Sequence, residues 1–329
     1  MRIFLTGGSG FVGGHLLERL APRHTFVALS RSEKSDVTIR ALGGTPVRGD
    51  LNAVPVEALR GCDAVIHSAA FVGDWGTRAQ FMEANVEGTR RVLDAARAAG
   101  VPRFIHVGTE AALFNGAPLV NVDETAPYAS PQRFLYSETK ALAEQLVLQA
   151  NAPGFATLSI RPRFVWGPRD TTILPAILEL ARRGQFAFVG GGTERTSTTH
   201  VYNVVHGLEL ALTAGEGGNA YFITDGEEHT FRDFLTRLAA THNVTLPSRT
   251  VPAVVARTAA ALAETLWSIT GARSNPPMTR FGVAIMAATV TIRTDKARQA
   301  LGYAPVITVA DGLRQLQQAH GGTAALSAS

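Results

Sequence analysis

The sequence contains a single cysteine, Cys62, among 329 residues. An internal disulfide is therefore excluded, and we expect a reducing compartment, the cytoplasm. The first apolar run begins directly after Arg2, so we also expect no signal peptide.

Long uncharged stretches and blocks of one charge sign are also lacking. The stretch closest to membrane-spanning length, 251–270, contains Arg257 and Glu264. Charged residues make up 18%, the net charge is only +4, and no Lys/Arg block occurs, so nucleic acid is not an expected partner. Histidines have no cysteine or carboxylate cluster beside them in the sequence, and we predict no metal site.

Glycine is plentiful and well placed at the start of the chain. The apolar run 3–5 is followed by Gly7, Gly10 and Gly13, and then by apolar residues at helical spacing. This pattern predicts a strand, a tight turn and a helix whose free N–H groups face a pyrophosphate. A glycine turn that binds nothing is the alternative. The strand–turn–helix context favours a dinucleotide site.

Strand-like and helical runs then alternate along the first half of the chain. We predict strands at 26–29, 46–50, 63–67, 103–107 and 156–160, and clear helices at 78–99 and 136–149. The alternation predicts an α/β fold, a Rossmann-type doubly wound parallel sheet, with a smaller C-terminal substrate domain. The expected boundaries are 1–165 for the dinucleotide domain, with 198–225 returning to it, 166–197 and 226–320 for the substrate domain, and 321–329 for a flexible tail.

The end of the second strand bears on which dinucleotide binds. An NAD site usually has an acidic residue there, whereas this chain has Ser30 and Arg31, with Lys34 nearby. A guanidinium suits a 2′-phosphate, so NADP(H) is favoured over NAD(H). The alternative is that Arg31 is a solvated loop residue. Asp50 after the third strand is either an adenine ligand or an ordinary turn residue.

Tyr136 and Lys140 form a Y-x-x-x-K pattern on a predicted helix, where positions i and i+4 share a face. The lysine charge beside the phenol would stabilise phenolate and make Tyr136 a usable acid–base. Thr109 follows the fifth strand at its carboxyl end, where ligands bind in such sheets, and its hydroxyl could hold a substrate oxygen. Asn85 either forms a hydrogen bond to a main-chain carbonyl or a water inside its helix, or is an ordinary polar helix residue.

Together these motifs resemble the extended short-chain dehydrogenases/reductases over nearly the whole chain. The motifs that carry the resemblance are TGGSGFVG at 6–13, GDL at 49–51, HSAA at 67–70, NVEGT at 85–89, YSETK at 136–140 and RPRFVWGP at 161–168. Within that superfamily the chain is most similar to the 3β-hydroxysteroid dehydrogenase / sterol-4-carboxylate 3-dehydrogenase branch, through VGDWG at 72–76, YFITDG at 221–226 and the apolar segment 252–270 followed by PPMTR at 276–280.

The resemblance implies a role for each matching position. Tyr136 would be the acid–base, Lys140 its pKa modulator and a ribose ligand, and Thr109 stands where relatives usually have Ser. The expected cofactor-binding residues are Gly7, Ser9, Gly10, Phe11, Val12, Gly13, Ser30, Arg31, Asp50, Leu51, Ala69, Ala70, Lys140, Pro162 and Val165. The expected substrate-lining residues are Trp75, Glu110, Phe114 and Trp166.

Nucleotide-sugar epimerases and dehydratases share this fold and place an arginine before a strand to grip the diphosphate. The matching position here is Thr196, with Arg195 one place away. This argues against a nucleotide-sugar substrate. A non-catalytic dinucleotide sensor is the other alternative, and retention of both Tyr136 and Lys140 argues against it.

The apolar segments 251–270 and 281–286 have two interpretations. They are either the helical core of the second domain or a pocket wall or membrane-grazing lid for a water-poor substrate. In relatives the two long helices often form a homodimer face.

Taken together, the motifs and the resemblance predict an NADP(H)-preferring oxidoreductase that interconverts a secondary alcohol and a ketone on a bulky apolar substrate, steroid-like or a long-chain β-oxo acid.

Overall fold

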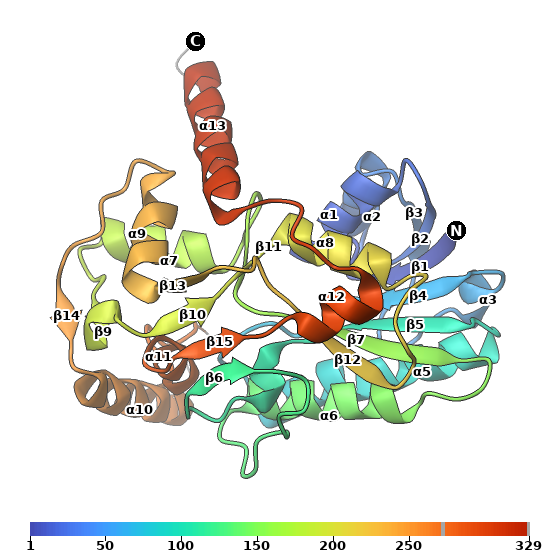
Figure 1. The fold of residues 1–329 in the computed structure, drawn as a ribbon, viewed down its shortest axis with the longest axis horizontal. Coiled ribbons are helices and arrows are strands. Elements are labelled where there is room, and N and C mark those ends of the chain that lie inside the picture. Colours follow the sequence, from blue (N-terminus) through green and yellow to red (C-terminus); the bar gives the residue numbers. More distant parts are fainter. Residues whose placement is uncertain (271–273, 328–329) are drawn as a thin grey trace.

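The computed structural model describes residues 1–270 and 274–327, with side chains described as far as His320. Its centre is a seven-stranded sheet in the order β12-β7-β5-β4-β1-β2-β3, in which every pairing is parallel (Figure 1). The strands are β1 (Arg2–Thr6), β2 (Thr25–Ser30), β3 (Thr45–Arg48), β4 (Ala64–His67), β5 (Arg103–Val107), β7 (Ala156–Pro162) and β12 (Asn219–Ile223).

Helices cover both faces of this sheet because alternate strand residues on both sides are apolar. On one face Ile3 and Leu5 pack with Leu16, while on the other Phe4 packs with Val92. Figure 1 shows α1, α2 and α8 on one side and α5 and α6 on the other. The helices of this part are α1 (Phe11–Leu20), α2 (Glu33–Ala41), α3 (Val56–Leu59), α4 (Arg78–Phe81), α5 (Gly88–Ala98), α6 (Leu135–Gln149), α8 (Val201–Leu210) and α12 (Asp295–Leu301).

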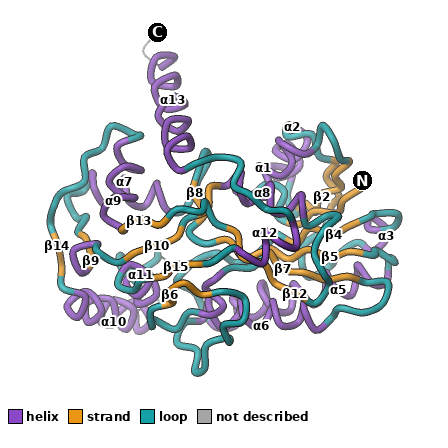
Figure 2. Tube along the Cα trace, in the orientation of Figure 1, coloured by secondary structure: helices purple, strands orange, loops and turns teal. Residues whose placement is uncertain are grey.

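A smaller part is built on a four-stranded sheet in the order β13-β10-β15-β6 and two strand pairs, β11-β8 and β14-β9. These strands are β6 (Leu119–Val122), β8 (Val165–Trp166), β9 (Phe188–Val189), β10 (Arg195–Ser197), β11 (Thr199–His200), β13 (Glu228–Thr230), β14 (Thr250–Val251) and β15 (Val290–Ile292). Its helices, purple in Figure 2, are α7 (Ile173–Arg182), α9 (Phe231–Ala240), α10 (Ala253–Thr270), α11 (Arg280–Met286) and α13 (Val309–Ser327), with a short 3₁₀ turn η3 (Gly190–Gly192).

The division of the chain differs in detail from the predicted boundaries. β6 lies within 1–165 in sequence but pairs with β15 of the smaller sheet. α12 lies within 226–320, yet Ala297 and Leu301 pack into the core of the large sheet. The placement of the domain boundary at 165 stays a prediction. Part of the predicted tail, 321–327, belongs to α13, and 328–329 lie outside the described residues.

The predicted helix at 78–99 is helical from 78 to 98, but it is not α-helical throughout. A π-helical segment, η1 (Met82–Glu87), separates α4 from α5 and contains Asn85. The Asn85 amide turns inward: its oxygen accepts from Phe71 N (2.7 Å), and its nitrogen donates to Thr139 Oγ1 (3.2 Å). π-bulges often occur at functional sites, and this one fixes the loop after β4 against α6.

Within the described residues, no helix combines the length and the apolar composition that crossing a membrane requires.

Candidate active site

The glycine turn has the geometry that the spacing predicts. Gly7 has φ of +76°, in the left-handed region, and its carbonyl accepts from Gly10 N (2.9 Å). A Cβ atom at Gly13 would lie 2.1 Å from Gly7 O, so only glycine lets α1 approach β1 this closely. The turn leaves Ser9 and Gly10 exposed at the N-terminus of α1, and Phe11 and Val12 half-buried. The residues present fit a pyrophosphate at this helix end.

The loop after β4 closes the other side of this turn. Ala69 N donates to Thr6 Oγ1 (3.1 Å), and Ala70 is half-buried beside it. A Cβ at Gly7 would meet Ala69 N at 2.9 Å, so backbone lies against backbone here. The approach of a flat ribose or nicotinamide to the small residues of this edge stays a prediction.

The residues predicted to bind the adenosine part of the dinucleotide lie at or just after the ends of β2 and β3. Ser30 is buried and donates to Ser32 O (3.1 Å), whereas Arg31 is exposed. Asp50 Oδ1 accepts from the main-chain nitrogens of Asn52 and Ala53, which is the turn role that the sequence left open. Adenine binding by Asp50 and Leu51 stays a prediction.

Tyr136, in the first turn of α6, has its phenol beside the hydroxyl of Thr109, which lies two residues after the end of β5. Burial raises the pKa of the Tyr136 phenol, the Glu110 carboxylate raises it further, and the hydrogen bond with Thr109 lowers it. The structure thus brings together the hydroxyls that the sequence places 27 residues apart. Together they can hold a carbonyl or carbinol oxygen and exchange a proton with it.

Lys140 lies one helical turn after Tyr136 and is 4% exposed. Its ammonium donates to the carbonyl oxygen of Val107 (2.8 Å) and lies 3.3 Å from His106 Nε2. Burial lowers the pKa of Lys140 to about 8, while Glu144 acts in the opposite direction. The sequence predicts Lys140 but gives no indication of its bonds to β5.

Glu110 differs from its expected role as a residue that faces the substrate. It is 4% exposed, and its two oxygens are bound by Arg163 Nη1 and Thr109 Oγ1. Arg163 is also fully buried and donates from Nε to Thr196 Oγ1 (3.0 Å). Sequence reasoning missed Arg163. The available signal was a pair of arginines, Arg161 and Arg163, directly after the apolar strand run that ends at Ile160.

An aromatic cluster lies beside Tyr136. The Phe281 ring of α11 is 5.5 Å from the Tyr136 ring and 5.3 Å from Phe134. Phe114 stacks on Phe134 (6.0 Å, 13°) and is 1% exposed, so it supports the wall from behind rather than lining it as predicted. The sequence predicts Phe114 as a site residue but singles out neither Phe134 nor Phe281.

The prediction that Trp166 lines the substrate pocket is wrong for this structure. Its side chain is fully buried, packs on His200 and Phe234, and donates from Nε1 to Asp225 Oδ2 (2.8 Å). An indole N–H inside a core needs an acceptor, and Asp225 supplies it. Trp75, in the loop after β4, is half-buried, and its contact with substrate stays a prediction.

Two strand ends complete the predicted cofactor set. Pro162 is the last residue of β7 and pairs with Ile223 of β12, and Val165 of β8 pairs with Thr199 of β11. Pro162 is the carboxyl end of a strand of the large sheet, and Val165 follows it by three residues in the separate β11-β8 pair.

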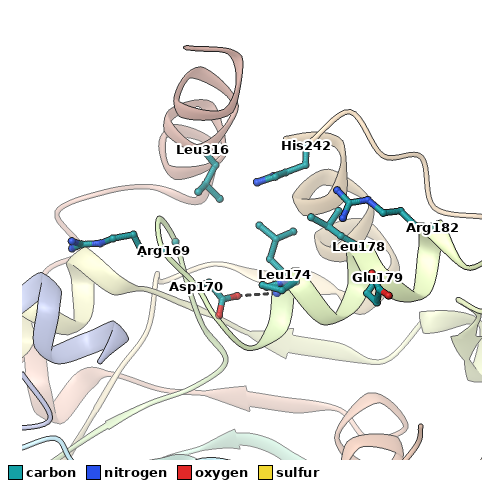
Figure 3. A pocket seen from close by; sticks show the side chains of 10 residues that line it. Arg169, Asp170, Leu174, Leu178, Glu179, Arg182, His242 and Leu316 are labelled. Atoms are coloured by element: carbon teal, nitrogen blue, oxygen red, sulfur yellow. Dashed lines mark hydrogen bonds between the residues drawn. The ribbon is translucent and has the colours of Figure 1, made fainter. Parts of the chain in front are cut away.

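A separate cavity of about 520 Å³ lies between α7, His242 and α13. Figure 3 shows Leu174 and Leu178 of α7 facing Leu316 of α13 there, with Arg182 and His242 at the rim. None of the predicted catalytic residues lines it, so it is not the site of the Tyr136 chemistry.

The sequence matches a model of the 3-beta hydroxysteroid dehydrogenase/isomerase family over residues 4–254. The chain belongs to this family. It is 45% identical to 4-hydroxy-2-methyl-3-oxo-4-farnesyl-3,4-dihydroquinoline-1-oxide ketoreductase of Stigmatella aurantiaca, over 97% of this chain and 96% of that protein. It is 35% identical to 2-alkyl-3-oxoalkanoate reductase of Stenotrophomonas maltophilia (strain K279a), over 96% of this chain and 98% of that protein.

The fold is shared more widely. UDP-glucuronic acid 4-epimerase from Bacillus cereus, solved in complex with NAD, superposes with a TM-score of 0.74 at 19% identity, over 97% of this chain and 100% of that one. At this identity the likeness concerns the fold alone. The predicted Rossmann-type fold and the predicted family are confirmed, and the chain is an oxidoreductase of the extended short-chain type that acts on hydroxyl or keto groups.

Proposed function

We propose that the protein is an NADP(H)-preferring reductase/dehydrogenase that interconverts a secondary alcohol and a ketone on a bulky apolar substrate. The observation that carries this proposal is the contact of Tyr136 with Thr109 on one side and with the Phe281 ring on the other. A proton donor beside an aromatic wall suits a carbonyl on a water-poor molecule. The two bacterial relatives are named for such ketones, a farnesylated quinoline oxide and a 2-alkyl-3-oxoalkanoate.

The chain's own residues supply binding, orientation and the proton. A nicotinamide dinucleotide, when bound, supplies the hydride chemistry. The turn at Gly7–Gly13 would hold its pyrophosphate, Lys140 its ribose, and the small residues Ala69 and Ala70 would allow close approach. Tyr136 transfers its proton to the carbonyl oxygen in reduction and takes it back in oxidation.

The preference for NADP(H) is supported by the surroundings of Arg31. Arg31 is exposed at the end of β2, and among the described residues no carboxylate forms an ion pair with it. The nearby Asp36 is paired instead with Arg48 (2.6 Å). A free guanidinium at this position favours a phosphate on the ribose 2′-oxygen.

The alternative, a nucleotide-sugar epimerase or dehydratase, finds little support at Thr196. This residue is fully buried, and its hydroxyl accepts from Arg163 and donates to Ser197 O (2.9 Å). It has no proton left for a diphosphate.

We also propose a peripheral membrane contact through α10. Val255, Ala259, Leu262, Leu266 and Ile269 recur at alternating four- and three-residue spacing, and all five are exposed. The opposite face, with Ala256 and Ala260, packs toward Val283. Such a one-sided exposed stripe suits an interfacial helix beside a site for lipid-like ketones.

The test is a paired assay that follows oxidation of NADPH and of NADH with 3-keto steroids, β-keto acids and small aryl ketones. We expect NADPH turnover with bulky ketones, loss of turnover in Tyr136→Phe, and a change of preference toward NADH in Arg31→Asp. Tight dinucleotide binding without turnover of any ketone or alcohol would overturn the proposal, as would a nucleotide-sugar bound to the purified protein.

A further inference from the structure

Two groups of β5 lie within hydrogen-bond distance of the Lys140 ammonium. Its Nζ is 2.8 Å from the carbonyl oxygen of Val107 and 3.3 Å from Nε2 of His106. Burial lowers the pKa of Lys140 to about 8, so the amine is still mainly charged at pH 7. An ammonium has three protons to donate and no lone pair. The contact with His106 is therefore a hydrogen bond only if Nε2 offers a lone pair.

His106 is a neutral imidazole. It is 2% exposed, and it pairs in register with His67 of β4 on one side and with Ser159 of β7 on the other. A second positive charge 3.3 Å from the ammonium would be repelled strongly in this buried place. Burial, then the neighbouring Lys140 and His67, hold the pKa of His106 well below its usual range. A neutral imidazole has one N–H and one lone pair, so a lone pair on Nε2 places the proton on Nδ1.

No other contact of His106 opposes this tautomer. Its Nδ1 is buried and has no hydrogen-bond partner among the residues that the structure describes. Either tautomer therefore leaves Nδ1 unpaired, and only the contact with Lys140 distinguishes the two forms. A proton on Nε2 would set an N–H against the ammonium, whereas a proton on Nδ1 gives the ammonium its second acceptor.

His67, whose ring lies 5.6 Å from that of His106, has its proton on the other nitrogen. Thr89 donates its only hydroxyl proton to the carbonyl oxygen of Asn85 (2.6 Å), so it accepts from Nε2 of His67 (3.0 Å). Nδ1 of His67 then offers its lone pair to the hydroxyl of Thr6 (2.7 Å). The two adjacent buried histidines thus have opposite tautomers, because each tautomer is set by its own partners.

Glu144, one turn after Lys140 on α6, does not compete for the ammonium. This carboxylate is fully buried, and its Oε2 accepts from Ser159 Oγ (2.5 Å) and from Arg161 Nε (2.9 Å). Within the described part of the chain, no hydrogen bond or ion pair joins it to Lys140. The third proton of the ammonium therefore has no acceptor among the described residues.

We propose that His106 is a positioning residue whose Nε2 lone pair, together with the Val107 carbonyl, holds two protons of Lys140 and leaves the third for a ribose hydroxyl of a bound nicotinamide dinucleotide. The inference rests on the proposed function, in which Lys140 binds that ribose. A donor held at two of its three protons is pre-organised, so less conformational freedom is lost when the ribose binds. His106 acts only through Lys140, and no covalent bond changes in this step.

The tautomers are measured on the full-length protein without cofactor or substrate. In protein labelled with ¹⁵N at the histidine rings, long-range ¹H–¹⁵N correlation spectra distinguish Nδ1–H, Nε2–H and imidazolium. The signals that vanish in His106→Gln and in His67→Gln assign these two rings among the nine histidines. At pH 7 we expect the proton of His106 on Nδ1 and that of His67 on Nε2. A proton on Nε2 of His106, or an imidazolium there, would overturn the inference.

Dinucleotide binding tests the role of the lone pair. The amide oxygen of His106→Gln keeps an acceptor near the position of Nε2, whereas His106→Leu fills the space without one. In calorimetry we expect His106→Leu to bind NADPH about tenfold or more weakly than wild type, and His106→Gln to stay within about threefold of it. Wild-type affinity in His106→Leu, or equal losses in both variants, would contradict the role of His106. Should His106→Leu fail to fold, the wild-type spectrum alone decides.

Phe104→Leu is the matched control. Phe104 is fully buried and lies two residues before His106 on β5, so both side chains are on the same face of the sheet. We expect this variant to have a lower melting temperature and an unchanged affinity for NADPH. A loss of affinity equal to that of His106→Leu would assign the effect to a loosened strand and overturn the inference.

The inference and the proposed function fail separately. If the tautomers and the affinities are as expected but no ketone or alcohol is turned over, only the proposed function is contradicted. Turnover of a bulky ketone by a protein whose His106 has its proton on Nε2 contradicts only the role of His106.

Discussion

The Lys140 ammonium donates a 2.8 Å hydrogen bond to the carbonyl oxygen of Val107, at the end of β5. The bond fixes the amine at the edge of the sheet where Tyr136 and Thr109 also lie, but it costs the charge most of its water. The pKa of Lys140 falls from 10.5 to about 8 because the group is buried. Function and stability are therefore opposed at this position.

We expect Lys140→Met to stabilise the fold at pH 7 while it removes turnover. Because the folded pKa lies below the unfolded one, the unfolded chain binds more protons between pH 8 and 10.5, and wild-type stability from this group rises with pH through that window. At pH 7 the buried charge of Lys140 costs the folded state about 3 kcal/mol, and its substitution by Met also loses a hydrogen bond that contributes about 1 kcal/mol. Urea unfolding at pH 7 and at pH 10 measures the free energy of unfolding of both proteins and its pH dependence.

The exposed Lys34 provides the control for that substitution. Lys34→Met should leave the unfolding free energy nearly unchanged at both pH values. A Lys140→Met protein less stable than wild type at pH 7 would contradict the expectation.

His67 affects the stability of the fold at acidic pH, whereas Lys140 affects it at alkaline pH. Its nitrogens contact Thr6 Oγ1 (2.7 Å) and Thr89 Oγ1 (3.0 Å), and burial, followed by the charge of Lys140, lowers its pKa to about 3. The unfolded chain therefore binds one more proton between pH 3 and 6.5, and stability is lost as pH falls through this window.

We expect His67→Gln to flatten the loss of unfolding free energy on acidification by about 1.4 kcal/mol per pH unit between pH 4 and 6. The glutamine keeps polar contact with Thr6 and Thr89 but does not titrate. Thermal unfolding from pH 4 to 8 measures the slope. His24→Gln, nearer the surface, is the comparison, and equal slopes in wild type and His67→Gln would disprove the assignment.

Two neighbouring glycines of α1 offer a sharp test of the dinucleotide turn. A Cβ at Gly13 would lie 2.1 Å from Gly7 O, which forces the turn to move. A Cβ at Gly14 would meet the end of the Leu42 side chain at 3.4 Å and the Gly8 carbonyl oxygen at 3.8 Å, which are ordinary van der Waals contacts. We expect Gly13→Ala to lose dinucleotide binding in calorimetry by at least about tenfold.

Gly14→Ala should bind as wild type and gain up to about 1 kcal/mol of stability from helix propensity. Similar binding by both alanine variants would mean that the dinucleotide does not use this turn.

The sequence predicts the large sheet well because each strand is marked by local pattern. The run predicted at 103–107 is β5, with the same bounds, and the glycine spacing alone indicates the turn that Gly7 and Gly13 form. The π-segment around Asn85 was not predicted, because helical periodicity continues through it and the inward turn depends on Phe71, a partner in another loop.

The errors at the site have one physical cause. Trp166 follows a strand end, as a pocket residue would, but its indole N–H is satisfied by Asp225, far along the chain. Glu110 and Arg163 form their pair across 53 residues. Such partners are chosen by the packing of the finished fold, and no local spacing encodes them.

Phe281 gives a test of substrate size. Its ring lies against Tyr136 and Phe134, on the helix that covers the site. We expect Phe281→Ala to lower kcat/KM for bulky apolar ketones by about tenfold or more, since burial of a phenyl ring contributes about 1.5–3 kcal/mol. Small ketones, which do not reach the ring, should be reduced at nearly the wild-type rate.

Ile285→Ala, one turn later on α11, is the control for a loosened helix. It should lower both rates to the same modest extent. Equal losses on large and small ketones in Phe281→Ala would mean that the ring supports the fold and does not select the substrate.

The exposed face of α10 gives the last prediction. Leu262, Leu266 and Ile269 are 67%, 54% and 79% exposed, which is unusual for three large apolar side chains on one helix face. We expect the protein to sediment with vesicles of anionic phospholipid, and the triple variant Leu262→Gln/Leu266→Gln/Ile269→Gln to stay in solution with unchanged activity on water-soluble ketones.

The control is Val254→Gln, because Val254 is exposed on α10 but lies outside the stripe, whereas substitution of the buried Ala256 or Ala260 would disturb the fold. The membrane proposal is contradicted if neither protein sediments with vesicles and light scattering shows that wild type is a dimer while the triple variant is a monomer. In that case the stripe joins two copies of the chain.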